Sequence, residues 1–314
     1  MANTNYNNGR KPDSLYGLLA SADATYAMLP QNLRLEIEKI SRGLSEFGPR
    51  KLRRPGIGTE FFEARQYRPG VDNKQPNAKL SARAGKPIVV ENEAEIRQHF
   101  YLWRDPSPST NYASRKDLFT VKQAEEVMLL AFAKHLARNE EMIGILDRDG
   151  QYRGGKAPEW LGQQLLGADV TIVTGDMPRV SRPLPRNSTV ALFSDFLMKP
   201  EDLIKGLDSL NGIGLRGFLV MVLDPEEIEF KNFKGHRKFE GLEGEGTISF
   251  KKAESVQSAY QTAMRERIAW LQKLADAKGF QFILQRTDEP LHKGLLEIYG
   301  LSHQPKGHAP SPGL

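Results

Sequence analysis

Three oxygen-bearing side chains stand at alternate positions in one short stretch of this 314-residue sequence. They are Asp105, Ser107 and Ser109, in the order Asp-Pro-Ser-Pro-Ser. A carboxylate and two hydroxyls at this spacing can converge on one hard cation such as Mg²⁺, which prefers octahedral oxygen coordination and keeps several waters. The stretch is a candidate metal-binding loop. The alternative, which stays open here, is a purely structural proline- and serine-rich loop.

A metal site of this kind needs a second carboxylate from elsewhere in the chain, and Asp195 is the candidate. It closely follows the apolar run 189–193, TVALF, which is typical of a buried strand. The loop 105–109 likewise follows an extended stretch, IRQHFYLW (residues 96–103). If the two strands lie in one parallel sheet, both loops lie at its carboxyl edge. The predicted metal ligands are Asp105, Ser107, Ser109 and Asp195.

The elements that must position these residues alternate along the chain from about residue 96. Further apolar runs of strand length are MIGIL (142–146), VTIV (170–173), GFLVMVL (217–223) and FQFILQ (280–285). Helical patterns occur between them, near 120–139, 158–166, 200–210, 253–278 and 289–299. Continuous apolar strands indicate a sheet covered by helices on both faces. The alternation predicts a three-layer α/β domain with a mostly parallel sheet.

Outside the α/β pattern, the sequence predicts disordered ends and a smaller N-terminal region. We expect a disordered N-terminus at residues 1–14 and a disordered tail at 303–314, because both are polar and rich in Asn, Pro, Gly or Ser. Residues 15–95 are expected to form a helix near 31–46, followed by a small β-rich subdomain. The α/β domain is expected to occupy residues 96–302.

Composition excludes several classes of function. The chain has no cysteine, which excludes disulfides, thiolate metal sites and a cysteine nucleophile and fits a reducing compartment. The longest apolar run, Val127–Ala133, is far shorter than the roughly 20 residues of a membrane-spanning helix. The first residues carry no apolar stretch typical of a secretory signal. We therefore expect a cytoplasmic protein.

Positive charge gathers in one part of the sequence. The net charge is +5, and residues 42–86 hold eleven lysines and arginines against four acidic residues. Such a basic segment can bind nucleic acid or steer an acidic protein partner towards the chain. The six histidines form no zinc-binding pair at helical spacing, and no local catalytic set is evident. These absences leave a non-catalytic binding function open, and the family resemblance described next makes it the main hypothesis.

Longer motifs resemble a known family over about residues 40–300. The motifs are Gly58-x-Glu60-Phe61, Arg65-x-Tyr67-x-Pro69-Gly70-x-Asp72, Ser81-Ala82-Arg83, Ser194-Asp195-Phe196, Asp224-Pro225-Glu226, Phe233-x-Gly235, Tyr260 and Thr287-Asp288-x-Pro290. This pattern resembles the bacterial domain of unknown function 58 (DUF58) family. The Asp-x-Ser-x-Ser loop with a later strand-ending Asp also resembles the metal-ion-dependent adhesion site of von Willebrand factor A domains.

The resemblance implies a von Willebrand-A-like fold and a partnership with MoxR-type AAA ATPases. Family members are proposed to act as adaptors in chaperone-like maturation or regulation of other proteins, here an unknown client protein. A site-bound Mg²⁺ with exchangeable waters would let a partner's carboxylate complete its coordination. Two alternatives from other classes stay open, a metal-assisted hydrolase and a nucleic-acid binder using residues 42–86.

The sequence also departs from the family pattern. The family usually has Asp and Trp where this chain has Asn77 and Ala78. Arg104 directly precedes Asp105 and could pair with its carboxylate in place of a cation. The third element of the adhesion site, normally a threonine, has only Thr174 as a candidate.

Overall fold

The computed structural model of the chain describes residues 14–29, 52–69, 72, 75–94, 98–166, 177–180, 182–185, 188–240 and 246–298. The chain divides into two compact units, residues 1–38 together with 99–314, and residues 39–98. Several expectations fall outside the described residues. These are the helix near 31–46, the strand at 170–173, Thr174, the tail 303–314 and the N-terminus 1–14 apart from Ser14.

A six-stranded sheet forms the centre of the larger unit, in the order β10-β7-β6-β3-β4-β5. Its strands are β3 (His99–Arg104), β4 (Met142–Ile145), β5 (Gln151–Tyr152), β6 (Thr189–Ser194), β7 (Arg216–Leu223) and β10 (Phe280–Arg286). All neighbours are parallel except the short edge strand β5, which is antiparallel to β4. The mostly parallel sheet that the sequence predicted is confirmed.

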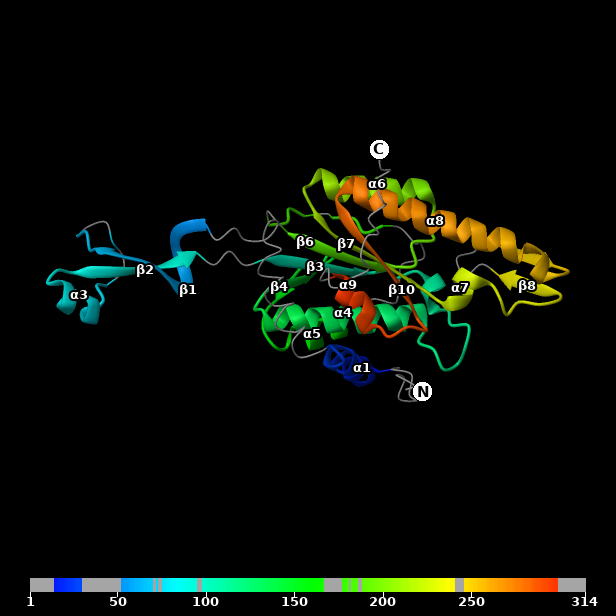
Figure 1. The fold of residues 1–314 in the computed structure, drawn as a ribbon, viewed down its shortest axis with the longest axis horizontal. Coiled ribbons are helices and arrows are strands. Elements are labelled where there is room, and N and C mark those ends of the chain that lie inside the picture. The colour runs from blue at the N-terminus through cyan, green and yellow to red at the C-terminus, as the bar shows by residue number, and fades with distance from the viewer. Residues whose placement is uncertain are drawn as a thin grey trace, which may run out of the picture. The chain divides into compact units, whose positions relative to one another are not determined.

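Helices cover both faces of this sheet (Figure 1). On one face lie α6 (Pro200–Gly212) and α8 (Gln257–Lys278), and on the other lie α4 (Val121–Arg138), α5 (Ala157–Leu166) and α9 (His292–Ile298). Shorter elements are α7 (Pro225–Glu229) and the 3₁₀ turns η1 (Pro108–Asn111) and η2 (Ala253–Val256). The three-layer α/β architecture is confirmed.

Strand β3 shows how the sequence fills both layers. Its side chains alternate between the two faces, as pleated backbone requires. Phe100 and Leu102 join the core beneath α4, whereas Tyr101 and Trp103 join the core beneath α6 and α8. All four are buried. Burial on both faces explains the continuous apolar sequence of residues 100–103 within this strand.

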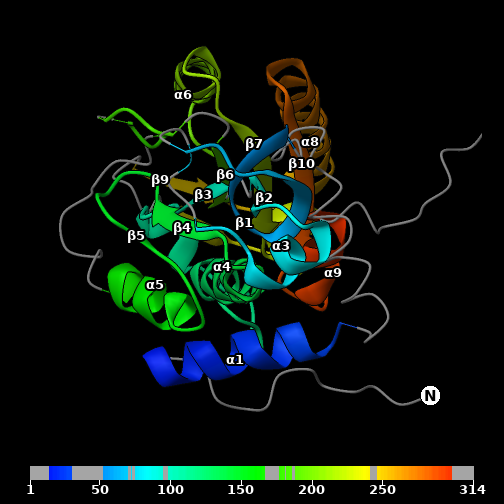
Figure 2. The ribbon, with the colours of Figure 1, turned by 90° about the vertical axis from the view of Figure 1, so that its left-hand side faces the viewer.

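Helix α4 is buried on its outer side as well. A further helix, α1 (Leu15–Ala27), packs against α4 and α5 (Figure 2). Leu18, Ala22 and Tyr26 of α1 belong to the same buried cluster as the apolar residues of α4. The structure thus differs from the expected domain limits, because residues 15–27 belong with the α/β unit and not with the β-rich segment.

The smaller unit is built around two antiparallel strands, β1 (Leu52–Gln66) and β2 (Ile88–Ala94). A short helix, α3 (Ala78–Ala84), comes between them in the chain. Asn77 begins this helix, since its Oδ1 accepts a hydrogen bond from the Leu80 backbone N–H at 3.1 Å. The small β-rich region expected before the α/β domain is therefore present.

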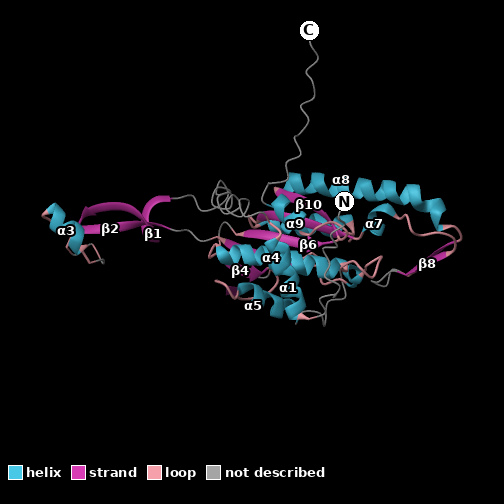
Figure 3. Ribbon diagram, turned by 60° about the horizontal axis from the view of Figure 1, so that its bottom comes forward, coloured by secondary structure: helices cyan, strands magenta, loops and turns pink. Residues whose placement is uncertain are grey.

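A second two-stranded sheet stands between β7 and α8 in the chain. It consists of β8 (Arg237–Glu240), labelled in Figure 3, and β9 (Thr247–Phe250). The two strands pair antiparallel. We name the described residues 230–240 and 246–252 the hairpin segment. None of the helices in the described ranges is both long and apolar enough to cross a bilayer.

Candidate metal-binding site

The predicted ligands lie where the order of strands reverses in the sheet. Strand β3 has β4, the next strand along the chain, on one side and β6 on the other. The chain leaves β3 towards α4 on one face, and it leaves β6 towards α6 on the opposite face. Connections that diverge in this way open a crevice at the carboxyl ends of the two strands. Asp105 follows β3 and Asp195 follows β6, so both lie at this crevice.

A chain of hydroxyl groups links the two loops. The Ser107 and Ser109 hydroxyls are hydrogen-bonded at 2.9 Å, and the Ser109 hydroxyl donates to Asp195 Oδ2 at 2.8 Å. Residues 86 positions apart in sequence are thereby in direct contact. The structure brings all four predicted ligands together, which the sequence could only infer from the ends of two strands.

The Asp105 carboxylate also ties the loops together. Its Oδ1 accepts the Ser107 backbone N–H at 2.8 Å, and its Oδ2 accepts the Ser194 hydroxyl at 2.5 Å. A carboxylate has about four lone-pair positions. The Asp105 carboxylate therefore keeps lone pairs for a further ligand while its side chain is held in one orientation.

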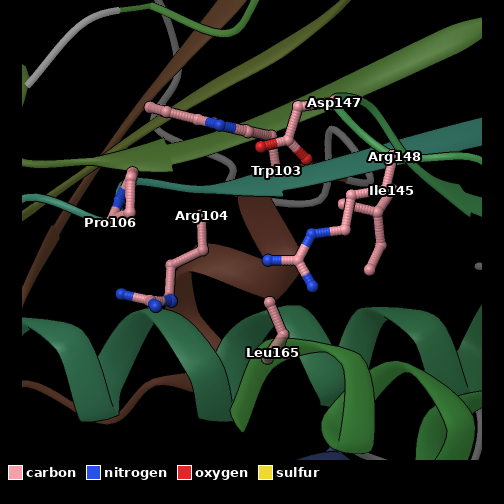
Figure 4. Close-up of a pocket in the computed structure, with 7 residues that line it drawn as sticks. All are labelled: Trp103, Arg104, Pro106, Ile145, Asp147, Arg148 and Leu165. Atoms are coloured by element: carbon pink, nitrogen blue, oxygen red, sulfur yellow. The ribbon is translucent and has the colours of Figure 1, made fainter. Parts of the chain in front are cut away.

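Arg104 does not replace a cation at the Asp105 carboxylate. Its Nη1 donates to the backbone carbonyl oxygen of Asp105 at 2.7 Å, and its Nε lies 3.4 Å from Glu126 Oε1 on α4. Figure 4 shows the side chain directed towards the helices beneath the sheet, beside a separate small cavity of about 20 Å³ that Trp103, Ile145 and Leu165 also line. That volume is room for about one water molecule. Arg104 therefore does not pair with the Asp105 carboxylate, and the alternative that it takes the place of a cation is wrong.

Glu125 of α4 adds an unpartnered carboxylate behind the site. Its side chain is fully buried, and neither oxygen has a hydrogen-bond partner in the described part of the chain. Burial raises the pKa of Glu125 well above its ordinary value, and the charges of Asp105 and Asp195 raise it further. Nothing in the sequence separates Glu125 from the neighbouring Glu126. Its role depends on which side of α4 faces the loops, so a local sequence pattern does not reveal it.

Acidic groups continue along the rim at the end of β7. The Asp224 carboxylate begins α7 by accepting the Glu226 N–H, and it also accepts the Ser114 N–H, each at 2.8 Å. The latter bond fixes the far end of the loop that starts at Asp105. Burial raises the pKa of Glu227 to about 8, with the charge of Asp195 adding to the shift.

The loop after Asp195 is held from α8. Arg267 Nη2 donates to the carbonyl oxygens of Phe196 at 2.7 Å and of Met198 at 2.5 Å. Phe196 has a positive φ of 47°, which is strained for a bulky residue, and its side chain is fully buried. Backbone strain of this kind persists only where the surroundings enforce it. The position of Asp195 is thus determined by its neighbours and by Arg267.

The donor set fits a hard divalent cation. The converging groups are carboxylate and hydroxyl oxygens, which suit Mg²⁺ or Mn²⁺ and not a soft metal. Within the described ranges, no three His, Cys, Asp or Glu side chains meet as a ready-made metal cluster. A cation here would therefore depend on the two serines and on water. The carboxylates of Asp105 and Asp195 supply the negative charge that favours such a cation, and burial together with these charges helps to keep Glu125 protonated when no cation is bound.

The motif residues of the smaller unit have local structural roles. Asp72 pairs with both terminal nitrogens of Arg65, at 2.5 and 3.0 Å, and accepts the Arg68 N–H. The hydrogen bond from Arg65 holds the pKa of Asp72 at about 2. The Ser81 hydroxyl accepts the Ile88 N–H at 2.8 Å. These motif residues close the turns that connect β1, α3 and β2.

Fold and site together define a three-layer α/β protein with a carboxylate–hydroxyl crevice at the point where its strand order reverses. A family described as "Protein of unknown function DUF58" matches residues 63–269, about two thirds of the chain. The chain belongs to this family, so the resemblance to the DUF58 family found in the sequence is confirmed. No curated protein sequence matches the chain significantly.

Proposed function

We propose that the chain is a non-catalytic adaptor whose crevice binds Mg²⁺ and, through it, a carboxylate of a partner protein. The observation that carries this proposal is the contact of Ser109 with both Ser107 and Asp195. This contact joins the loops of β3 and β6 through side chains that all offer oxygen atoms for coordinating a cation. A structural loop alone would not require an unpartnered buried carboxylate, Glu125, behind it.

Each residue of the crevice has a distinct role in this proposal. Asp105, Ser107, Ser109 and Asp195 hold the cation. Ser194 orients Asp105 through its hydroxyl, and Arg267 positions the loop that carries Asp195. When bound, Mg²⁺ would supply a coordination position that exchanges water for a carboxylate.

The partner in this proposal is a MoxR-type AAA ATPase, which presents the chain with client proteins. Family resemblance supports this partner, and an ATP-dependent partner fits the cytoplasmic location that we expect. Binding through a single carboxylate at a cation would make the interaction specific to one acidic residue of the partner.

Affinity capture tests the partner. The full chain would be immobilised and incubated with a purified MoxR-type ATPase in Mg²⁺ or in EDTA. We expect retention in Mg²⁺ only, and loss of retention in the Ser107→Ala/Ser109→Ala variant. Ser258→Ala, at an exposed serine of α8, is the matched control and should bind as the unchanged chain does. Equal retention by all three proteins would contradict a contact through the crevice.

One observation favours a second function, a metal-assisted hydrolase. A carboxyl group with a pKa of about 8, such as Glu227, can donate and accept protons near neutral pH. Glu227 is hydrogen-bonded to the Asp224 N–H at 2.7 Å and lies at the rim of the crevice. A screen with phosphatase and esterase substrates in Mg²⁺ tests this function, and the adaptor proposal predicts no turnover.

A further inference from the structure

A groove lies beside the crevice, between α7 and the hairpin segment. It encloses about 310 Å³ and is lined by Tyr112, Ser114, Glu226, Asn232, Phe233, Arg237, Lys238 and Phe239. Figure 1 shows α7, β8 and the start of α8 together at one end of the sheet. This volume is within the range of sites that bind a ligand group.

One wall of the groove is aromatic. Phe233 and Phe239 are half-buried, and their ring centroids are 5.1 Å apart in an edge-to-face arrangement. Buried Phe230 supports both from behind, with centroids 4.6 Å from Phe233 and 5.5 Å from Phe239. Tyr260 of α8 packs against Phe230 at 4.7 Å. The rings brace one another, so this apolar wall is preformed.

The groove also carries positive charge. Arg237 and Lys238 are exposed on β8, and neither forms an ion pair with any described residue. The acidic residue nearest to them in the lining, Glu226, is already engaged, because its carboxylate accepts both the backbone N–H and the side-chain amide of Asn232. Among the described residues, the hairpin segment therefore presents two exposed cations without an acidic partner next to an apolar wall.

The groove and the crevice share one loop. The stretch that begins at Asp105 continues to Tyr112 and Ser114, which line the groove, and it is fixed there by the bond from the Ser114 N–H to Asp224. The Ser114 hydroxyl is buried and has no hydrogen-bond partner in the described structure. A ligand that enters the groove could supply that missing partner.

We propose that this groove binds an acidic segment of a partner protein, with one aromatic or large apolar side chain against Phe233 and Phe239 and carboxylates at Arg237 and Lys238. The proposal rests on the proposed function, because the groove would select the residues flanking the carboxylate bound at the crevice. Single-stranded nucleic acid is less suitable. It needs a series of separate exposed rings on which successive bases stack, whereas this wall is one edge-to-face pair that offers a single contact position.

The test uses a probe whose binding does not depend on the cation. A fluorescein-labelled short peptide, with one phenylalanine flanked by glutamates, would be titrated with the full chain in EDTA at low salt, and anisotropy would be recorded. We expect saturable binding that weakens about tenfold in Arg237→Glu/Lys238→Glu, since each exposed charge contact contributes modestly. A peptide with alanine in place of phenylalanine should bind about tenfold more weakly than the parent peptide.

A matched control separates local from overall charge. Lys205→Glu/Lys273→Glu makes the same charge change on exposed positions of α6 and α8, and its affinity should stay within about twofold of the unchanged chain. Equal losses in both double variants, or tighter binding of a single-stranded oligonucleotide than of the peptide, would overturn the proposal. Binding in EDTA that survives in Asp105→Asn supports the groove even if the crevice binds no cation.

Discussion

At the scale of residues, the alternate spacing of Asp105, Ser107 and Ser109 was enough to predict a candidate metal-binding loop. The spacing could not show that Ser194 donates to Asp105 or that Glu125 lies behind the site. Those contacts depend on the register of β3 against β6 and on the rotation of α4. Both are properties of tertiary packing that a local pattern does not contain.

Replacing Asp105 tests its role in joining the loops. Asp105→Ala leaves the buried Ser107 N–H and Ser194 hydroxyl without their acceptor, and each such group costs about 1–3 kcal/mol. We expect the free energy of unfolding to fall by about 2–4 kcal/mol, measured by urea denaturation. Asp105→Asn keeps one acceptor oxygen and should cost less than half as much. Equal losses in the two variants would contradict this description.

Replacing Arg267 tests how Asp195 is positioned. Arg267→Met keeps the packing volume but removes the donors to the Phe196 and Met198 carbonyls. We expect a loss of about 1–3 kcal/mol in stability. Affinity for Mn²⁺, measured by titration calorimetry, should also weaken although every proposed ligand is intact. Unchanged Mn²⁺ affinity would show that Arg267 has only a structural role.

At the scale of elements, most of the central sheet and its helices were predictable, because its parallel strands contain short apolar runs and α4 begins with a capping box. The Thr120 side chain accepts the Gln123 N–H at 3.1 Å, and Gln123 reaches back to the Thr120 N–H. Helix α1 was not predicted, since its stretch is short and follows polar sequence. The signal that could have found it is α4 itself, whose apolar run 127–133 requires cover on two sides.

Leu18 tests whether α1 is part of the core. Its side chain is 2% exposed against α4 and α5, whereas Tyr16 on the same helix is 84% exposed. Leu18→Ala should lower the free energy of unfolding by about 2–4 kcal/mol. Tyr16→Ala should change it by no more than about 0.5 kcal/mol. Similar effects of the two substitutions in chemical denaturation would mean that α1 does not pack as described.

At the scale of the whole molecule, buried ionisable groups set how stability depends on pH. Burial lowers the pKa of His135 on α4 to about 4 from its ordinary value of 6.5. The unfolded chain therefore binds more protons between these values, and stability is lost as the pH falls from about 6.5 to about 4. We expect a loss of about 3 kcal/mol in urea unfolding over this range. His135→Gln should reduce this loss of unfolding free energy at acid pH. An unchanged dependence of the free energy of unfolding on pH would contradict the assignment.

Glu227 produces the opposite dependence at higher pH. Its folded pKa of about 8 lies above the ordinary value of 4.5, so the folded chain keeps a proton that the unfolded chain releases. The corresponding stability is present below about pH 4.5 and is lost as the pH rises to about 8. Glu227→Gln should remove most of this loss of stability with rising pH, measured by urea unfolding as before. An unchanged pH dependence in Glu227→Gln would contradict this assignment and would show that other groups, such as buried Glu125, dominate.

The molecule as a whole combines a predictable scaffold with a site that only the fold assembles. Five parallel strands and the helices beside them follow from periodicity, whereas the two described units and the placement of α1 follow from contacts distant in sequence. The crevice lies between loops that are 86 residues apart. The central proposal is that these two loops together bind one cation.

Titration calorimetry measures that event directly. Mg²⁺ and Mn²⁺ would be titrated into the unchanged chain and into Asp105→Asn, which removes a carboxylate charge while keeping its shape. The account predicts saturable binding of one ion per chain in the first protein and no saturable heat in the second. No heat in either protein, or equal heats in both, would contradict it.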